Sequence, residues 1–232
     1  MGTGTSLRRD EKTRRYTAKC SCGSVEFELY GSYGTFGCCC ADCLAGAKYV
    51  DEKAEAAGKA VQHISVLEPG KPQSVAVAVF PPSRIKCVKG REHLRLFKLT
   101  PNTQTMRFYT ECCLTAVMNS MKSNGKKTAF CSFNVQTLSP TPALTERIYC
   151  REALRKADLP QDGIPNNGLL SFSLGSTLVP AIMLGYRSTW EDKDGPFLTK
   201  PEEVTEIAGP DPYERAGFKA PKPPNGLTSE CN

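Results

Sequence analysis

The stretch CSCGSVEF at residues 20–27 places two thiols, one residue apart, in a glycine-containing turn directly before an alternating strand pattern. A second run, CCCADC at residues 38–43, follows another strand-like segment. Turns at strand ends allow several thiol groups to point to one side, which suits a metal site. The two runs therefore predict a β protein whose strand ends carry clustered sulfur ligands.

The number and spacing of the cysteines indicate metal ligands rather than disulfides. The chain of 232 residues contains 12 cysteines, and eight of them fall in three short clusters, at 20 and 22, at 38, 39, 40 and 43, and at 112 and 113. The first residues carry charge where an export signal needs an apolar stretch, so we expect a cytoplasmic protein with reduced thiols. The apolar stretches are shorter than the ~20 residues of a membrane span, so we expect no membrane span.

Strand-like runs recur at short spacing and predict a mainly β, antiparallel fold with a few peripheral helices. These runs, rich in Val, Phe and Ile, are 24–29, 74–80, 84–88, 94–99, 105–110 and 129–135. The segment 100–104 should join two of them into a hairpin that leads directly to Cys112. Helical composition predicts helices at 51–61, 145–157 and 176–186.

Composition divides the chain into four parts. Residues 1–15 form a basic tail and 219–232 a Pro-rich tail, both expected to be disordered. Between them we expect a β domain at 16–145 and a helical and loop extension at 146–218 packed on it. The net charge is +6, but the first fifteen residues hold five basic and two acidic side chains. The rest of the chain is nearly balanced, so nucleic acid is not the expected partner.

Ligand counting predicts one or two zinc ions, each in a tetrahedron of soft ligands with Zn–S bonds of about 2.3 Å. The first site would be structural and would use Cys20, Cys22 and Cys112. Whether Cys113 is its fourth ligand stays open. The second would use Cys38, Cys40 and Cys43 and keep one coordination position open, as catalytic zinc sites do. Neighbours on a strand point to opposite faces, which places Cys39 and Cys113 in doubt. The alternative is a set of reduced buried thiols without metal.

Three motifs together resemble the family of glutathione-dependent formaldehyde-activating enzymes, which includes centromere protein V. They are Cys20-x-Cys22-Gly23-x-Val25-x-Phe27, Cys38-x-Cys40-x-x-Cys43 and Arg107-Phe108-Tyr109-x-x-Cys112, and they fall within residues 17–138. The chain looks most like an uncharacterised branch whose last motif is Tyr-x-x-Cys-Cys. The resemblance implies a β-tent fold with two zinc ions and carbon–sulfur lyase activity on glutathione–aldehyde adducts.

Three positions depart from that family pattern. Cys39 stands where the family usually has His, Leu44 where it has Arg, and Tyr109 where it has the first cysteine of a late pair. Either Cys113 replaces the missing ligand or the first site is weak or empty.

Two functions therefore stay open. The first is a zinc enzyme acting on adducts of glutathione or another thiol with an aldehyde. The second is a non-catalytic, zinc-stabilised interaction module whose basic tail binds nucleic acid or chromatin. Thiol redox sensing through the cysteines at 38–40 is a third hypothesis.

Asp42, inside the second metal loop, is a candidate proton carrier at an open zinc site, with solvation of the loop as the alternative role. His63 and His93 lie away from the cysteine runs and are not expected to be ligands. Alternate positions of one strand could form a basic face that attracts carboxylates or phosphates. The alternative is that this face is only solvated. The residues at these positions are Lys89, Arg91, His93 and Arg95. The first six residues match a minimal N-myristoylation pattern at Gly2.

Overall fold

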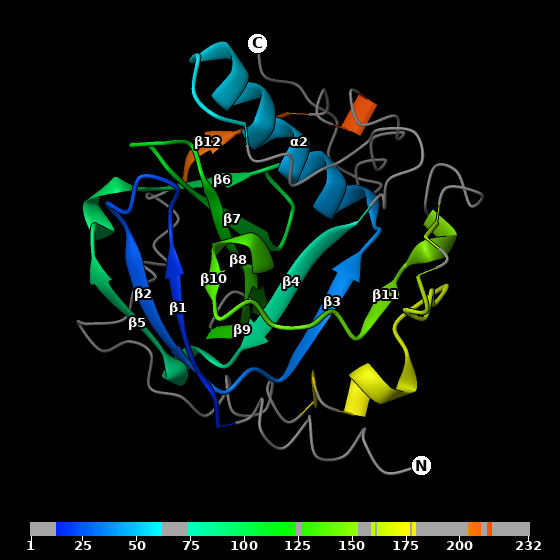
Figure 1. Ribbon diagram of the computed structural model, residues 1–232. Helices are drawn as coiled ribbons and strands as arrows, with labels where there is room; N and C mark the ends of the chain where they lie inside the picture. Colours follow the sequence, from blue (N-terminus) through cyan, green and yellow to red (C-terminus); the bar gives the residue numbers. More distant parts are fainter. Residues whose placement is uncertain are drawn as a thin grey trace.

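Over the residues that the structure describes, the fold is mainly β, with two sheets and one long helix (Figure 1). This computed structural model describes residues 13–61, 74–123, 127–152, 159–160, 162–176, 178–179, 204–209 and 213–214. The smaller sheet has the strand order β10-β1-β2-β5 and the larger one β11-β3-β4-β9-β8-β7-β6-β12. None of the helices in these residues is long and apolar enough to span a lipid bilayer.

The strands and helices have the following bounds. The smaller sheet consists of β1 (Arg15–Lys19), β2 (Glu26–Tyr30), β5 (Ile85–Lys89) and β10 (Leu138–Ser139). The larger sheet consists of β3 (Gly34–Cys38), β4 (Val75–Phe80), β6 (Leu94–Lys98), β7 (Thr105–Thr110), β8 (Ala116–Ser123), β9 (Lys127–Asn134), β11 (Glu146–Ile148) and β12 (Val204–Ile207). The long helix is α2 (Ala41–Ala56), and the described residues also form the single-turn 3-10 helices η1 (Pro82–Arg84), η2 (Arg91–His93), η3 (Val135–Thr137) and η4 (Cys150–Glu152).

The larger sheet is the middle of three layers, with α2 on one face and the smaller sheet on the other. Its strand β4 reads VAVAVF, a continuous apolar run suited to burial on both faces. Val77 and Val79 pack in one core with Leu44 of α2, whereas Phe80 packs in the second core with Phe27 of the smaller sheet. The alternation of a strand thus sends neighbouring residues of β4 into two different cores.

The predicted hairpin is present, and all six predicted strand runs coincide with strands of the structure. Leu94 pairs with Thr110 and Phe97 with Arg107 in antiparallel register. Two edge strands depart from the antiparallel expectation: β11 runs parallel to β3 and β12 parallel to β6. Both come from the segment 146–218 that was expected to be a helical and loop extension. Lys53 of α2 fixes β12 through Glu206, with an Nζ to Oε1 distance of 2.8 Å.

Two helix predictions differ from the structure. The helix expected at 51–61 begins ten residues earlier, because Cys40 has the extended backbone of an N-cap and the residues after it are good helix formers. The helix expected at 145–157 is wrong over its first part, since residues 146–148 form β11 and 150–152 form η4, while 153–157 lie outside the described residues. Strand pairing with β3 overrides local helix propensity there. Of the helix expected at 176–186, residues 176, 178 and 179 are helical, and 177 and 180–186 lie outside the described residues; residues 172–175, before the expected start, are also helical.

The expected tails fall largely outside the described residues, which omit 1–12 and 215–232 and therefore also Gly2. The described residues nevertheless begin inside the expected basic tail, at residue 13. Arg15 opens β1 and pairs with Tyr30 of β2.

Candidate metal centres

Four cysteines from two distant segments meet beside the end of the smaller sheet. We call Cys20, Cys22, Cys112 and Cys113 the closed group; their sulfur atoms all lie within 4.8 Å of one another. The Sγ of Cys112 lies 3.9 Å from that of Cys20 and 3.5 Å from that of Cys22. Cys20 and Cys22 lie 3.6 Å apart in the β1–β2 turn. Sulfur atoms at these spacings could share one metal ion.

A turn brings Cys113 into the closed group. Strand β7 ends at Thr110, and the chain then turns, with the Leu114 amide donating to the Thr110 carbonyl at 2.7 Å. Leu114 has a positive φ of 53°. Because Cys112 and Cys113 lie in a turn and not on a strand, their sulfur atoms are 3.8 Å apart on the same side. The strand-alternation argument against Cys113 therefore does not apply.

Hydrogen bonds from the surrounding chain favour the anion of Cys113 in the closed group, whereas burial raises the pKa of Cys20 and of Cys112. The Val25 amide donates to the Sγ of Cys20 at 3.2 Å. The Thr115 and Thr110 hydroxyls lie 3.1 and 3.3 Å from the Sγ of Cys113. Burial raises the pKa of Cys113, but hydrogen bonds from Ser21, Thr110 and Thr115 outweigh it, so the pKa falls below its ordinary value. This thiol is thus ready to lose its proton to a metal.

Three further cysteines gather at the start of α2. We call Cys38, Cys40 and Cys43 the open group; their sulfur atoms lie within 4.8 Å of one another, and no fourth His, Cys, Asp or Glu ligand atom joins them in the described part of the chain. Cys38 ends β3, Cys40 is the N-cap of α2 and Cys43 lies in its first turn. The Sγ atoms of Cys38 and Cys40 are 3.2 Å apart. The positive end of the helix dipole favours negative charge at this place.

Neighbouring thiols raise the pKa of cysteines in the open group, so these cysteines keep their protons while no metal is bound. The hydrogen bond to Cys40, together with burial, raises the pKa of Cys38 well above its ordinary value. The hydrogen bond with Cys38 raises the pKa of Cys43 in the same way, while Arg107 acts in the opposite direction. Metal binding here must therefore displace protons.

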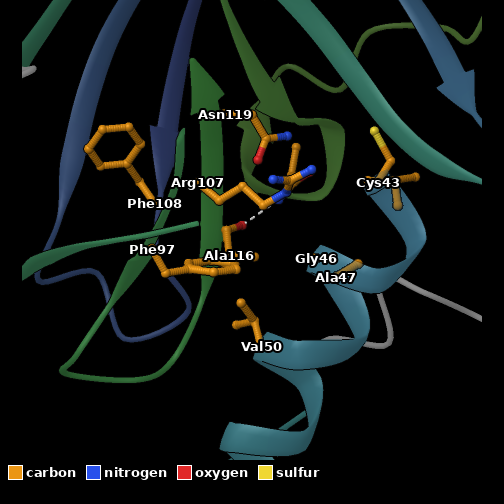
Figure 2. A pocket seen from close by; sticks show the side chains of 11 residues that line it. Cys43, Gly46, Ala47, Val50, Phe97, Arg107, Phe108, Ala116 and Asn119 are labelled. Carbon is orange, nitrogen blue, oxygen red and sulfur yellow. Dashed lines mark hydrogen bonds between the residues drawn. The ribbon is translucent and has the colours of Figure 1, made fainter. Parts of the chain in front are cut away.

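A buried arginine faces the open group from β7. Only 4% of Arg107 is exposed, and its Nη2 donates to the Asp42 backbone carbonyl at 3.0 Å. Its ion pair with the Asp42 carboxylate is long, 3.8 Å between Nη2 and Oδ2. Gly46 of α2 makes the room, because a Cβ there would lie 2.5 Å from the Arg107 Nε. Figure 2 shows Arg107 reaching from its strand towards the α2 turn that carries Cys43 and Gly46.

A small polar cavity lies beside Cys43 (Figure 2). Arg107, Asn119 and Asn134 supply its polar lining. The Asn134 Oδ1 is buried and has no hydrogen-bond partner within the described residues. The volume open to the centre of a water molecule is about 20 Å³, which is room for one water and not for a peptide.

Asp42 does not belong to the open group. Its Oδ1 accepts a hydrogen bond of 2.7 Å from the hydroxyl of Tyr213, and its Oδ2 faces Arg107. The sequence alone identified neither Arg107 nor Tyr213 as a site residue. The sequence did contain a signal for Arg107, because it is the single arginine in the strand 105–110. Residues two apart on a strand share a face, so Arg107 lies on the same face as Tyr109, which packs against α2.

The remaining cysteines and the basic face lie elsewhere. Cys39 points away from the open group, with its Sγ 3.7 Å from that of the buried Cys150. Cys131 is fully buried in the core between the sheets, and Cys87 is half-buried on β5. His63 and Cys231 lie outside the described residues.

The basic face expected from parity is not a single strand face. The residues Lys89, Arg91, His93 and Arg95 are divided by Gly90, which has a left-handed φ of 75°, and by η2. Both Arg95 and His93 face the carboxylate of Glu111. His93 belongs to neither cysteine group.

Comparisons with known proteins place the chain in no family. No family model matches the sequence, and no curated protein matches it. Among solved structures, a Rhodobacter sphaeroides protein studied by structural genomics is similar at 17% sequence identity and a TM-score of 0.34. That match covers 65% of this chain and 98% of the other. At this TM-score the likeness adds nothing to the argument about function.

Proposed function

We propose that this protein is a zinc-dependent enzyme of the glutathione-dependent formaldehyde-activating type, acting on thiol–aldehyde adducts as a carbon–sulfur lyase. The observation that carries the proposal is the open group, in which three sulfurs converge and no fourth ligand atom joins them within the described residues. Three protein ligands leave one coordination position for a substrate, which distinguishes catalytic from structural zinc sites.

The sulfur spacings fit zinc. A tetrahedral zinc with Zn–S bonds of about 2.3 Å holds its sulfurs about 3.8 Å apart. The distances within the closed group, 3.5, 3.6 and 3.9 Å, lie close to that value. The 3.2 Å between Cys38 and Cys40 is shorter, so these two sulfurs would separate slightly on binding. An all-thiolate ligand set favours zinc over harder divalent ions.

The positive charge of a buried arginine also supports a metal ion at the open group. Three thiolates around a divalent ion carry a net charge of −1, and a buried cation beside them would balance it. Arg107 is such a cation, since it is 4% exposed and its pairing with Asp42 is long, 3.8 Å. A buried guanidinium whose ion pair is this long is costly, so Arg107 is better explained by a negatively charged site than by an empty one.

When bound, the zinc would act as a Lewis acid on the sulfur or oxygen of a glutathione adduct. The chain's own residues prepare that site. Arg107 and the N-terminus of α2 favour the thiolate of Cys43, against the neighbouring thiols and the burial that raise its pKa. The Asp42 carboxylate, fixed at Oδ1 by Tyr213, is the candidate proton carrier beside the site. The cavity beside Cys43 admits only a water-sized group, so the peptide part of glutathione would lie outside it.

The alternative is a zinc-stabilised interaction module without catalysis. Two observations favour it: the closed group has four sulfurs, which suits a purely structural metal, and the cavity beside the open group is small. In this case both metals would stabilise the fold and neither would bind a thiol.

Metal analysis combined with calorimetric titration of glutathione separates these functions. We expect two zinc ions per chain in the wild type, one in Cys40→Ser, and glutathione binding only in the wild type. Cys87→Ser is the matched control, since Cys87 belongs to neither group. Purified protein without metal would contradict both functions, whereas two zinc ions without glutathione binding would leave the interaction module.

A further inference from the structure

The outer face of the smaller sheet carries a groove that is separate from both cysteine groups. Its volume is about 460 Å³, within the size range of small-molecule sites. The polar and aromatic side chains along it come from β1, β2, β5 and η1 and include Arg15, Thr17, Glu28, Tyr30, Arg84 and Lys86.

Strand register sets the charge of this groove. Arg15 pairs with Tyr30 across β1 and β2, and Glu28 pairs with Lys86 across β2 and β5. With Arg84 the lining holds three cations against one carboxylate. The excess of positive charge inside a concave surface favours an anionic ligand.

Arg84 is held ready for such a ligand. Its guanidinium carbon lies 5.4 Å from the ring centroid of Tyr30 and 5.2 Å from that of Tyr33. Contact with two aromatic rings orders the planar group and limits the entropy lost on binding. Its Nη1 is buried and has no acceptor in the part of the chain that the structure describes. A buried donor without an acceptor is costly, so a shift of Arg84 towards a ligand oxygen in the groove would relieve that cost.

We propose that this groove binds a small molecule with an oxyanion attached to a flat ring. Arg84 would bind the oxyanion, with Arg15 and Lys86 adding positive charge at the edge. Tyr30, which is 41% exposed, would stack against the ring. Phosphate and carboxylate share this chemistry, because a guanidinium fork binds two oxygens of either group.

Calorimetric titration with four probes tests the site: AMP, benzoate, adenosine and inorganic phosphate. We expect AMP or benzoate to bind saturably and at least about tenfold more tightly than adenosine and inorganic phosphate, since only the first two combine a ring with an anion. Tighter binding of AMP identifies phosphate as the preferred anion, and tighter binding of benzoate identifies carboxylate. Adenosine binding as tightly as AMP, or no saturable binding of any probe, would overturn the proposal.

Variants connect the binding to the groove. Arg84→Gln should weaken the better probe at least about tenfold, whereas Arg91→Gln, a matched change outside the groove, should leave binding unchanged. Tyr30→Phe should bind as the wild type does, and Tyr30→Ala more weakly. If Arg84→Gln does not fold, the exposed Lys86→Gln takes its place with a smaller expected loss. Binding of a short single-stranded oligonucleotide but of none of the four probes would contradict a small-molecule site.

Discussion

The sulfur atoms of Cys22 and Cys112 lie 3.5 Å apart although 90 residues separate them along the chain. Cys22 precedes β2 of the smaller sheet, and Cys112 follows β7 of the larger one. A metal ion bound between them would therefore join the two sheets directly. Because the unfolded chain has no such preformed site, the free energy of binding would add to the stability of the fold.

Replacing Cys22 with Ser should act mainly on stability. We expect one zinc ion fewer per chain and a free energy of unfolding reduced by about 3 kcal/mol or more, which lowers the melting temperature by roughly 6–12 °C for a chain of this length. Thermal unfolding and metal analysis measure both changes. Cys87→Ser should alter neither, and a Cys22→Ser variant that melts with the wild type would argue against a structural metal in the closed group.

Replacing Cys40 with Ser should act on binding instead of stability. The open group lies within six residues, from Cys38 to Cys43, so a metal there closes little chain. We expect one zinc ion and glutathione binding to be lost while most of the melting transition is kept. The role assigned to the open group would be wrong if Cys40→Ser unfolded the protein as severely as Cys22→Ser does.

Replacing Gly46 with Ala should displace Arg107. The added Cβ would lie 2.5 Å from its Nε and 2.7 Å from its Cδ, and the buried side chain has little room to move. We expect a loss of about 1–3 kcal/mol in the free energy of unfolding, as for other overpacked sites, and weaker zinc binding at the open group. Urea unfolding and competition with a zinc chelator measure the two effects.

The control for that change is Gly175→Ala, where the nearest atom to the added Cβ is 3.9 Å away. It should leave both properties close to those of the wild type. Equal zinc affinity in Gly46→Ala and the wild type would show that Arg107 does not support the open group.

The ion pair between Arg147 and Asp162 should make stability depend on acid pH. Arg147 donates to both carboxylate oxygens, at 3.0 and 2.7 Å, and holds the pKa of Asp162 at about 2, below its ordinary 3.8. The folded protein thus binds this proton more weakly than the unfolded chain does. The stabilisation is complete above about pH 4 and is lost as the pH falls towards 2.

Asp162→Asn should therefore be less stable than the wild type at pH 7, and the difference should shrink as the pH falls from 4 to 2. Urea unfolding at a series of pH values measures this, with the exposed Glu92→Gln as control. A difference that stays constant down to pH 2 would mean that the carboxylate charge is not what stabilises the fold.

The positions of the central strands could be predicted because they follow from local pattern. The run 74–80 is apolar after Ser74 and is followed by two prolines, and 94–110 contains two alternating runs around a turn. The edge strand β11 was mistaken for a helix because its sequence favours a helix locally. It becomes a strand through pairing with β3, a segment more than a hundred residues earlier, and local pattern does not contain that partner.

The sequence by itself determined the chemistry of this protein: many thiols, clustered at strand ends, with the ligand types that a soft metal ion prefers. Only the tertiary structure decided which thiols meet. The turn after Thr110 brings Cys113 beside Cys112, and the parallel pairing of β11 with β3 brings Cys150 beside Cys39. Arg107 reaches the open group because β7 and α2 pack together across a glycine. These contacts depend on sheet order and on turns, which are set by packing over the whole chain and not by any short stretch of it.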